Sequence, residues 1–205
     1  MTAHLPFIEG PLLEGRRLPG AGIGWLDQRR RSALAQFEQL GLPTQRLESW
    51  KYTKLRPLYG TRYRPVGEVT TGTVAEWVPD IGTGPRAVFV NGRLRADLSR
   101  LSGLPKGVRF GALEDAIRER PDWIEAHLGA IAGDGDQAML ALNSALMDCG
   151  FVLHVEAGVT VPEPIEVVYL SGLNDGPVAY FPRNLIVIGD NAQATLIKHH
   201  AGGGT

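Results

Sequence analysis

Residues 151–170 read FVLHVEAGVTVPEPIEVVYL, two runs rich in β-branched and aromatic residues that are separated by a corner of Gly, Pro and acidic residues. Runs of this kind, bounded by Gly and Pro, are typical of β-strands. A second pair of runs follows, with Gly189-Asp-Asn191 as its corner. The pattern therefore predicts strands at 151–155, 165–170, 184–188 and 193–199, whose short corners suit either a sandwich or the successive faces of a β-helix.

The first secure element of the chain has helical periodicity. The apolar residues of 25–40 recur at the spacing of one helical face: Leu26, Ala33, Phe37 and Leu40. Gly41 and Pro43 follow directly, which is a common way for a helix to end. We therefore predict a helix over 25–40, and we interpret the run Arg29–Arg31 as its solvated face.

Local signals divide the middle of the chain into short elements. The apolar run 87–90 is followed by Asn91-Gly92, a type I′ turn signal, which predicts a β-hairpin over 87–95. Three helical patterns come next, at 113–117, 121–128 and 137–147. Pro121 separates the first two and Gly150 ends the third.

These elements make the chain an α+β protein with three parts. Glycine and proline interrupt residues 1–24, which predicts an irregular arm. A helical and mixed domain with the hairpin is expected over 25–150, and the strand-rich part over 151–205. The last strands would leave unpaired backbone groups and an open apolar end if the chain stopped there, so we expect a longer protein or a cover for that end.

The composition fits a globular chain. Of the 205 residues, 43% are apolar and 21% charged, and no apolar run reaches the roughly 20 residues that a membrane span needs. The 26 glycines and 14 prolines favour a turn-rich chain that contains β-structure. Cys149 is the single cysteine, which excludes an intrachain disulfide framework. Because the start also lacks a secretory signal pattern, we expect a cytoplasmic protein without a membrane association.

The charge is unevenly distributed although the net charge is only −1. Residues 1–66 carry 11 Lys/Arg against 5 Asp/Glu, whereas residues 67–205 carry 10 against 17. The basic residues are scattered, lack aromatic residues interleaved in a sheet, and stand beside an acidic remainder that repels phosphate. We therefore do not expect nucleic-acid binding.

The sequence offers few candidates for chemistry. The glycines at 20–24 lack the preceding strand and the Lys-Ser/Thr of a phosphate-binding loop. We interpret two carboxylate pairs as solvated surface: Glu114/Asp115 and Asp134/Asp136. Four residues carry atoms that could ligate a metal, although their spacing alone makes no chelate and we interpret them as structural: Cys149, His154, His199 and His200.

The most specific pattern is GLPTQRLESWKYT at 41–53, because it combines a helix stop, two aromatic residues and alternating charges in a fixed order. It resembles the amino-terminal signature of the SufD branch of the SufB/SufD family of iron–sulfur cluster assembly proteins. The matched positions include Arg46, Glu48, Trp50, Lys51, Tyr52 and Thr53. Further similar stretches lie at 88–93, 127–129, 141–145 with Asn143, 182–187 and 194–199.

The side chains of this signature permit two interpretations. Trp50 and Tyr52 offer large amphipathic surfaces, and Arg46, Glu48 and Lys51 can pair locally. We interpret the segment as packing in the amino-terminal helical region, with an interface role as the alternative.

The resemblance implies a fold and a function. In the family, a helical and mixed amino-terminal region leads into a right-handed parallel β-helix, through which SufD pairs with SufB. A SufC ATPase joins each of the two, and the complex is a scaffold for a nascent iron–sulfur cluster. For this chain the resemblance implies a non-catalytic scaffold subunit without a cofactor of its own, the cluster belonging to the assembled complex.

The chain also departs from the family pattern. Family members are about twice as long, so the resemblance covers their front part, and the SufC contacts are expected in the carboxy-terminal part. Cys149 stands where relatives often have Asp or another polar residue before Gly, so we do not interpret it as a cluster ligand. Two alternatives remain: a β-helix enzyme acting on polysaccharide, for which only Glu156, Glu163 and Glu166 gather near one edge, and a stand-alone interaction module whose basic amino-terminal part recruits an acidic partner.

Overall fold

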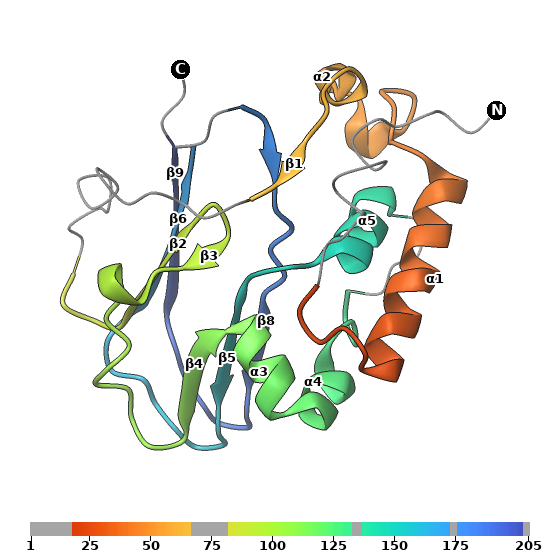
Figure 1. Cartoon of the computed structure of the whole chain (residues 1–205). Coiled ribbons are helices and arrows are strands. Elements are labelled where there is room, and N and C mark those ends of the chain that lie inside the picture. Colours follow the sequence, from red (N-terminus) through yellow and green to blue (C-terminus); the bar gives the residue numbers. More distant parts are fainter. Residues whose placement is uncertain (1–17, 67–81, 133–136, 173–175, 203–205) are drawn as a thin grey trace.

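The computed structural model describes residues 18–66, 82–132, 137–172 and 176–202 of the chain (Figure 1). Five α-helices and two short 3₁₀ helices lie in these ranges: α1 (Gly24–Leu40), η2 (Glu48–Trp50), α2 (Arg56–Tyr59), η4 (Ala96–Leu98), α3 (Leu113–Glu119), α4 (Pro121–His127) and α5 (Ala138–Leu146). Nine strands accompany them: β1 (Arg64–Pro65), β2 (Arg86–Val90), β3 (Arg93–Leu94), β4 (Val108–Ala112), β5 (Phe151–Val155), β6 (Ile165–Ser171), β7 (Val178–Ala179), β8 (Leu185–Ile188) and β9 (Leu196–Gly202). The predicted α+β class is confirmed.

The strands form two main sheets and a small pair. One sheet has the order β3-β2-β6-β9 and the other the order β4-β5-β8, while β1 pairs with β7. The hairpin partner β3 and the strand β4 are antiparallel to their neighbours, but β2–β6, β6–β9 and β5–β8 are parallel. Parallel neighbours need a long connection between them, so each sheet is assembled from distant segments of the chain.

The space between the two main sheets holds the largest apolar cluster. Alternate residues of β2, β5 and β6 point into it, and its members are buried: Ala87, Phe89, Phe151, Leu153, Val155, Val161, Ile165, Val167 and Tyr169. The ring of Phe89 stacks on that of Tyr169 with centroids 5.1 Å apart, and His200 stacks on the other side at the same distance. These three residues are register partners on β2, β6 and β9, so the stack crosses three strands.

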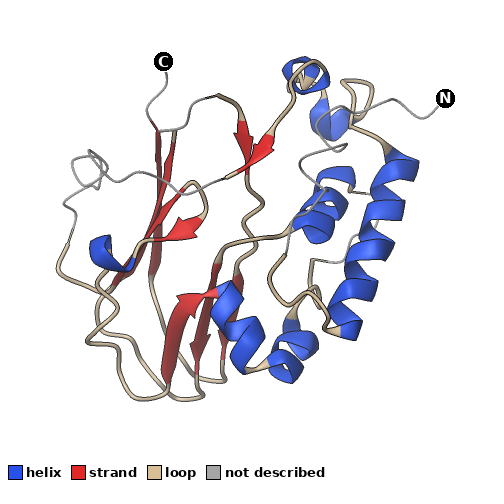
Figure 2. Ribbon diagram, in the orientation of Figure 1, coloured by secondary structure: helices blue, strands red, loops and turns tan. Residues whose placement is uncertain are grey.

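The helices cover one side of the sheets (Figure 2). Phe37 on α1 packs against α5, where the small side chains of Ala141 and Ala145 allow the two helices to approach closely. α3 and α4 pack against β5 and β8 through Ile117, Ile124 and their neighbours. In the described part of the chain, no helix is both long and apolar enough to cross a membrane.

One residue of the arginine run has a structural role that the sequence did not indicate. Arg30 is buried, and its Nη2 donates hydrogen bonds to the carbonyl oxygens of Pro19 at 2.8 Å and Met147 at 3.2 Å. The interpretation of Arg29–Arg31 as a solvated face is therefore wrong for Arg30, because it lies one turn from Leu26 and Ala33 on the buried side of α1. Arg31 is exposed, as expected.

Most local predictions are confirmed. Asn91 and Gly92 have φ of 46° and 81° between β2 and β3, which is the left-handed pair of a type I′ turn. Gly41 ends α1 with φ 65°, and its N–H donates to the Phe37 carbonyl at 2.8 Å. The predicted strand 151–155 is β5 itself, and Pro121 opens α4 directly after α3.

The predicted and observed strands differ at β9 and β4. β9 begins at Leu196 rather than at 193, because residues 193–195 still turn the corner at the Thr160–Gln193 bridge. The strand β4 was not predicted, since its short sequence contains Gly111 and is held extended by its antiparallel pairing with β5. Of the arm 1–24, residues 18–23 form turns, while 1–17 lie outside the described residues, as do Asp134 and Asp136.

Candidate functional site

The segment 41–56 is the strongest candidate for a functional surface, and α1 determines where it begins. After Gly41 turns the chain away from the helix, Leu42 and Pro43 are buried and anchor the segment. Leu42 belongs to the apolar cluster between α1 and α5. Within the signature, Leu42 and Pro43 thus provide the packing that was expected against the helical region.

Local hydrogen bonds hold the rest of the segment in shape. The backbone N–H of Trp50 donates to the Leu47 carbonyl at 2.9 Å, and the N–H of Thr53 donates to the Trp50 carbonyl at 2.9 Å. The Gln45 side chain closes the loop, because its Nε2 donates to the Lys51 carbonyl at 3.0 Å. The loop therefore satisfies backbone groups internally and leaves its side chains available.

The signature side chains beyond Pro43 lie on the surface. Arg46, Glu48, Lys51 and Thr53 are exposed, and Trp50 is half-buried. Tyr52 is 89% exposed and Leu47 52%. A large aromatic residue this exposed contributes little to folding, so packing in the helical region does not account for Tyr52.

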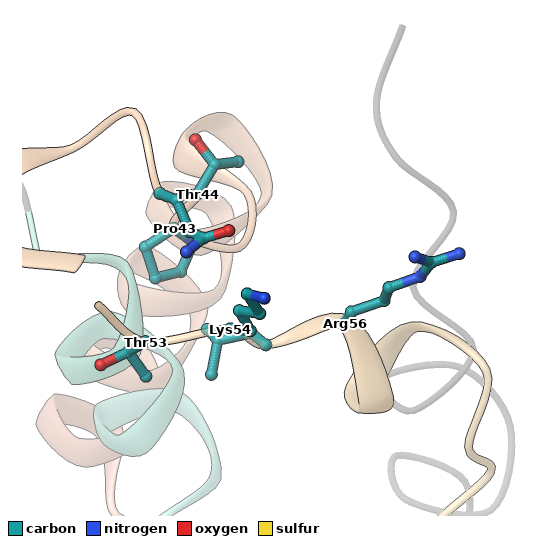
Figure 3. Close-up of a pocket in the computed structure, with 7 residues that line it drawn as sticks. Pro43, Thr44, Thr53, Lys54 and Arg56 are labelled. Atoms are coloured by element: carbon teal, nitrogen blue, oxygen red, sulfur yellow. The ribbon is translucent and has the colours of Figure 1, made fainter. Parts of the chain in front are cut away.

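The segment lines an open pocket of about 320 Å³, of which Figure 3 is a close-up. Pro43 and Thr44 face it from the turn after α1, and Thr53 and Lys54 lie across from them, while Arg56 is directed away. Its remaining lining residues are Gln45 and Leu55. Lys54 and Arg56 were not among the residues predicted from the sequence, although the local excess of cations could have indicated them.

The signature surface, which we define as residues 44–56, carries a local excess of positive charge. It has four cationic residues, namely Arg46, Lys51, Lys54 and Arg56, against the single acidic residue Glu48. Lys51 lies 3.6 Å from the Glu48 carboxylate and 5.6 Å from the centroid of the Tyr52 ring. At such exposure the ion pair contributes little to stability.

The four candidate metal ligands of the sequence are dispersed. Cys149 is buried at the end of the helical region, close to Gly92 of the hairpin turn. His154 lies on β5, whereas His199 and His200 are neighbours on β9, and His200 is used in the stack on Tyr169. Among the described residues, no three His, Cys, Asp or Glu side chains gather as a metal site.

His154 stands in a pocket of about 550 Å³ that is lined from β4, α3 and β5. Its ring lies 4.8 Å from that of Trp123, and its Nδ1 is buried without a hydrogen-bond partner in the described part of the chain. Desolvation, helped by the positive charge of Arg120, lowers the pKa of His154 below its ordinary value of 6.5. This shift in pKa favours the neutral form of the His154 imidazole.

The carboxylates considered for sugar chemistry have different surroundings. Glu166 is buried on β6, and its Oε2 accepts a hydrogen bond of 2.6 Å from Arg86 Nε on the neighbouring β2. Glu163 accepts a longer one of 3.3 Å from the Thr83 hydroxyl at the surface. Glu166 is therefore buried and already paired with a cation inside the protein.

Asn143 links the helical part to the strands. Its Nδ2 donates to the Pro182 carbonyl at 3.0 Å, and its Oδ1 accepts from Arg183 Nη1 at 3.3 Å. A side chain from α5 thus fixes the segment that leads into β8. Of the two roles considered for Asn143, these contacts support the structural one.

A family model described as the SufBD protein N-terminal region matches residues 21–167. The chain belongs to the SufBD family. It is 26% identical over 192 residues to an iron–sulfur cluster assembly SufBD family protein of Synechocystis sp., which covers 92% of this chain and 42% of that protein. It is also 29% identical over 184 residues to the iron–sulfur cluster assembly protein SufD of Bacillus subtilis, covering 86% of this chain and 41% of that protein.

The chain aligns with only part of the length of its SufBD relatives. SufB of Bacillus subtilis is 26% identical over 93 residues, which is 45% of this chain and 20% of that protein. The chain spans about two fifths of the length of the two relatives that it matches over most of its own length. The predicted resemblance of the chain to the amino-terminal portion of the SufB/SufD family is thereby confirmed.

Proposed function

We propose that the chain is the amino-terminal part of a non-catalytic scaffold subunit in a SufBCD-type complex for iron–sulfur cluster assembly. Its membership of the SufBD family supports a role in cluster assembly. In this proposal the nascent cluster is the cargo of the assembled complex, and the chain holds no cofactor of its own.

The parallel strand pairing is the observation that carries the scaffold role. Val152 on β5 pairs with Leu185 on β8, and Thr160 bridges Gln193, so the chain returns beside itself after about 33 residues. The next face repeats the arrangement, with Ile165 of β6 beside Leu196 of β9. A coil that returns in parallel at successive faces is the construction of a β-helix, and parallel crossovers are almost always right-handed. We therefore propose that β5 to β9 begin a right-handed parallel β-helix.

The outer strands of the two sheets supply the proposed contact with a SufB-like partner. Among the strands that the structure describes, β8 and β9 each have a neighbour on one side only. Ile186 and Ile188 on β8 are 47% and 43% exposed, although isoleucine favours buried strand positions. An edge of this kind accepts further strands through backbone hydrogen bonds, either from later turns of the same β-helix or from a partner's. In the proposal, such turns continue to the SufB-like subunit.

ATP hydrolysis falls to a SufC-like partner in this proposal. The alternative of a polysaccharide-active β-helix enzyme is weakened because Glu166, one of its three candidate carboxylates, is engaged by Arg86. Paired carboxylates of glycosidases must both face the substrate.

Co-expression tests the proposed function. The full reading frame would be produced with the SufB-like and SufC-like proteins of the same genome, with an affinity tag on the SufB-like subunit only. We expect the chain to co-purify in a complex whose native mass contains all three subunits, and to hydrolyse no ATP when purified alone. Recovery of the chain only as a free monomer, with the partners folded and associated without it, would contradict the proposal.

A further inference from the structure

We propose that the signature surface, residues 44–56, docks an extended acidic segment of a partner protein. This inference goes beyond the scaffold role, because the surface is built by η2, α2 and the turns around them rather than by the strands β8 and β9. The two proposals can therefore fail separately.

The exposed side chains of the surface do not serve the fold. Leu42 and Pro43 provide the buried anchor, and the loop closes on its own backbone through Trp50, Thr53 and the Gln45 amide. Tyr52 is 89% exposed all the same. A loop held rigid by local bonds presents its side chains with little loss of conformational entropy on binding, which favours recognition.

Charge indicates the chemistry of the partner. Lys51 faces Glu48 at 3.6 Å, and the three remaining cations of the surface are Arg46, Lys54 and Arg56, all exposed. In the described part of the chain, none of these three has a carboxylate within ion-pair distance. Three cations in one short segment, without an ion-pair partner among the described residues, favour a ligand that carries several carboxylates.

The pocket indicates that the acidic segment also carries an apolar residue. Pro43 and Leu55 provide an apolar lining within the cavity of about 320 Å³, and Leu47 and Tyr52 lie exposed nearby in the chain. Such a cavity is large enough for one aliphatic or aromatic side chain. An extended segment with one apolar residue between acidic ones would fill the cavity and meet the cations.

The same surface is poorly suited to nucleic acid. Binding of a single strand relies on open aromatic rings on which successive bases stack. Here Trp50 is half-buried, so Tyr52 is the single open ring within residues 44–56, whereas successive bases need several. The acidic residues elsewhere in the chain would also repel a phosphate backbone.

The probe is a fluorescein-labelled peptide of alternating glutamate and aspartate with a central leucine, and its binding is followed by fluorescence anisotropy at low and physiological ionic strength. A peptide with glutamine and asparagine in place of the acids, and a single-stranded RNA of equal charge, are measured in parallel. The test variant is Lys54→Gln/Arg56→Gln. The matched control is Arg31→Gln/Lys106→Gln, which removes one lysine and one arginine from exposed positions elsewhere.

We expect the test variant to bind the acidic peptide about tenfold more weakly and the control variant to remain within about twofold of the parent. The neutral peptide should not bind, and higher salt should weaken the acidic one. Thermal unfolding verifies that both variants are folded. Equal losses in the two variants, equal binding of the neutral peptide, or tighter binding of the RNA than of the acidic peptide would each overturn the proposal.

Discussion

Residues 151–170 and the signature surface at 44–56 both contain aromatic and β-branched or apolar residues, yet the fold treats them in opposite ways. In the first region Phe151, Val155 and Ile165 are fully buried between two sheets. In the second, Tyr52 and Leu47 face outward on a loop that local hydrogen bonds hold together. Burial of the first region thus accounts for the fold, and exposure of the second leaves it available for recognition.

The comparison is sharpest when an aromatic ring is removed from each region. Phe151→Ala leaves a cavity between the sheets and should lower the free energy of unfolding by about 4 kcal/mol. Tyr52→Ala should change it by less than about 0.5 kcal/mol, because the ring is exposed. Urea denaturation followed by circular dichroism measures both values. Similar losses in the two variants would show that the signature surface is part of the stabilising core.

Removing the partner of a buried charge should lower the free energy of unfolding nearly as much. Arg86→Met would strand the Glu166 carboxylate, whose side chain is only 4% exposed, and should destabilise the protein by about 3 kcal/mol. The double variant Arg86→Met/Glu166→Leu should recover most of this loss, because no unpaired charge remains. Arg95→Met, which breaks a pair with the exposed carboxylate of Asp97, is the surface control and should cost far less. If the double variant were no more stable than Arg86→Met, ion pairing would not be the cause.

Alanine substitutions at two glycines with positive φ compare a crowded position with an open one. At the open position only the backbone strain remains, whereas at the crowded one the added methyl group also meets neighbouring atoms. Gly92→Ala would bring a methyl group within 2.6 Å of the Cys149 sulfur and 2.9 Å of the Tyr180 ring, and we expect a loss of about 2 kcal/mol. Gly41→Ala, before the signature surface, meets no atom within 4 Å and should cost about 1 kcal/mol from its positive φ alone. Thermal denaturation of both variants measures the difference. A larger loss of stability in Gly41→Ala than in Gly92→Ala would contradict the description of Gly41 as the open position and Gly92 as the packed one.

The smallest expected effect is a pH dependence that arises at His154. Because its pKa is lower in the folded protein than the ordinary 6.5, the unfolded chain binds the proton more readily, and stability should fall as the pH drops from about 6.5 toward the folded pKa. Glu156 opposes this shift but does not reverse it. His154→Gln should weaken the pH dependence of the unfolding midpoint in that window. An unchanged pH profile in His154→Gln would show that His154 is not the origin of this pH dependence.

Elements with local signals could be predicted from the sequence, whereas pairings between distant segments could not. The helix that begins at Gly24 and the Asn91-Gly92 turn depend on residues that are neighbours in the chain. By contrast, β2 lies beside β6 through pairs such as Arg86 and Glu166, and no local pattern indicates which strands meet. The strand β4 was missed for the same reason, because its pairing with β5 keeps it extended.

The candidate site could be located from the sequence, but its exposure could not. The fixed order of the signature 41–53 identified the segment. Amphipathic residues such as Trp50 and Tyr52 suit a core and an interface equally well, and only the turn at Gly41 decides which of them reach the surface. The buried role of Arg30 was hidden in the same way, because three successive arginines resemble a solvated face until the position of α5 is known.

The scaffold role can be tested most directly by measuring the mass of the protein as it exists in the cell. We would tag the chromosomal gene, purify the protein anaerobically under mild conditions, and record native and denaturing mass spectra. We expect a subunit mass well above the 22.2 kDa of this chain, in a complex with SufB-like and SufC-like subunits. A mass of 22.2 kDa without companion subunits would contradict the scaffold role and leave only the family's ancestry and fold.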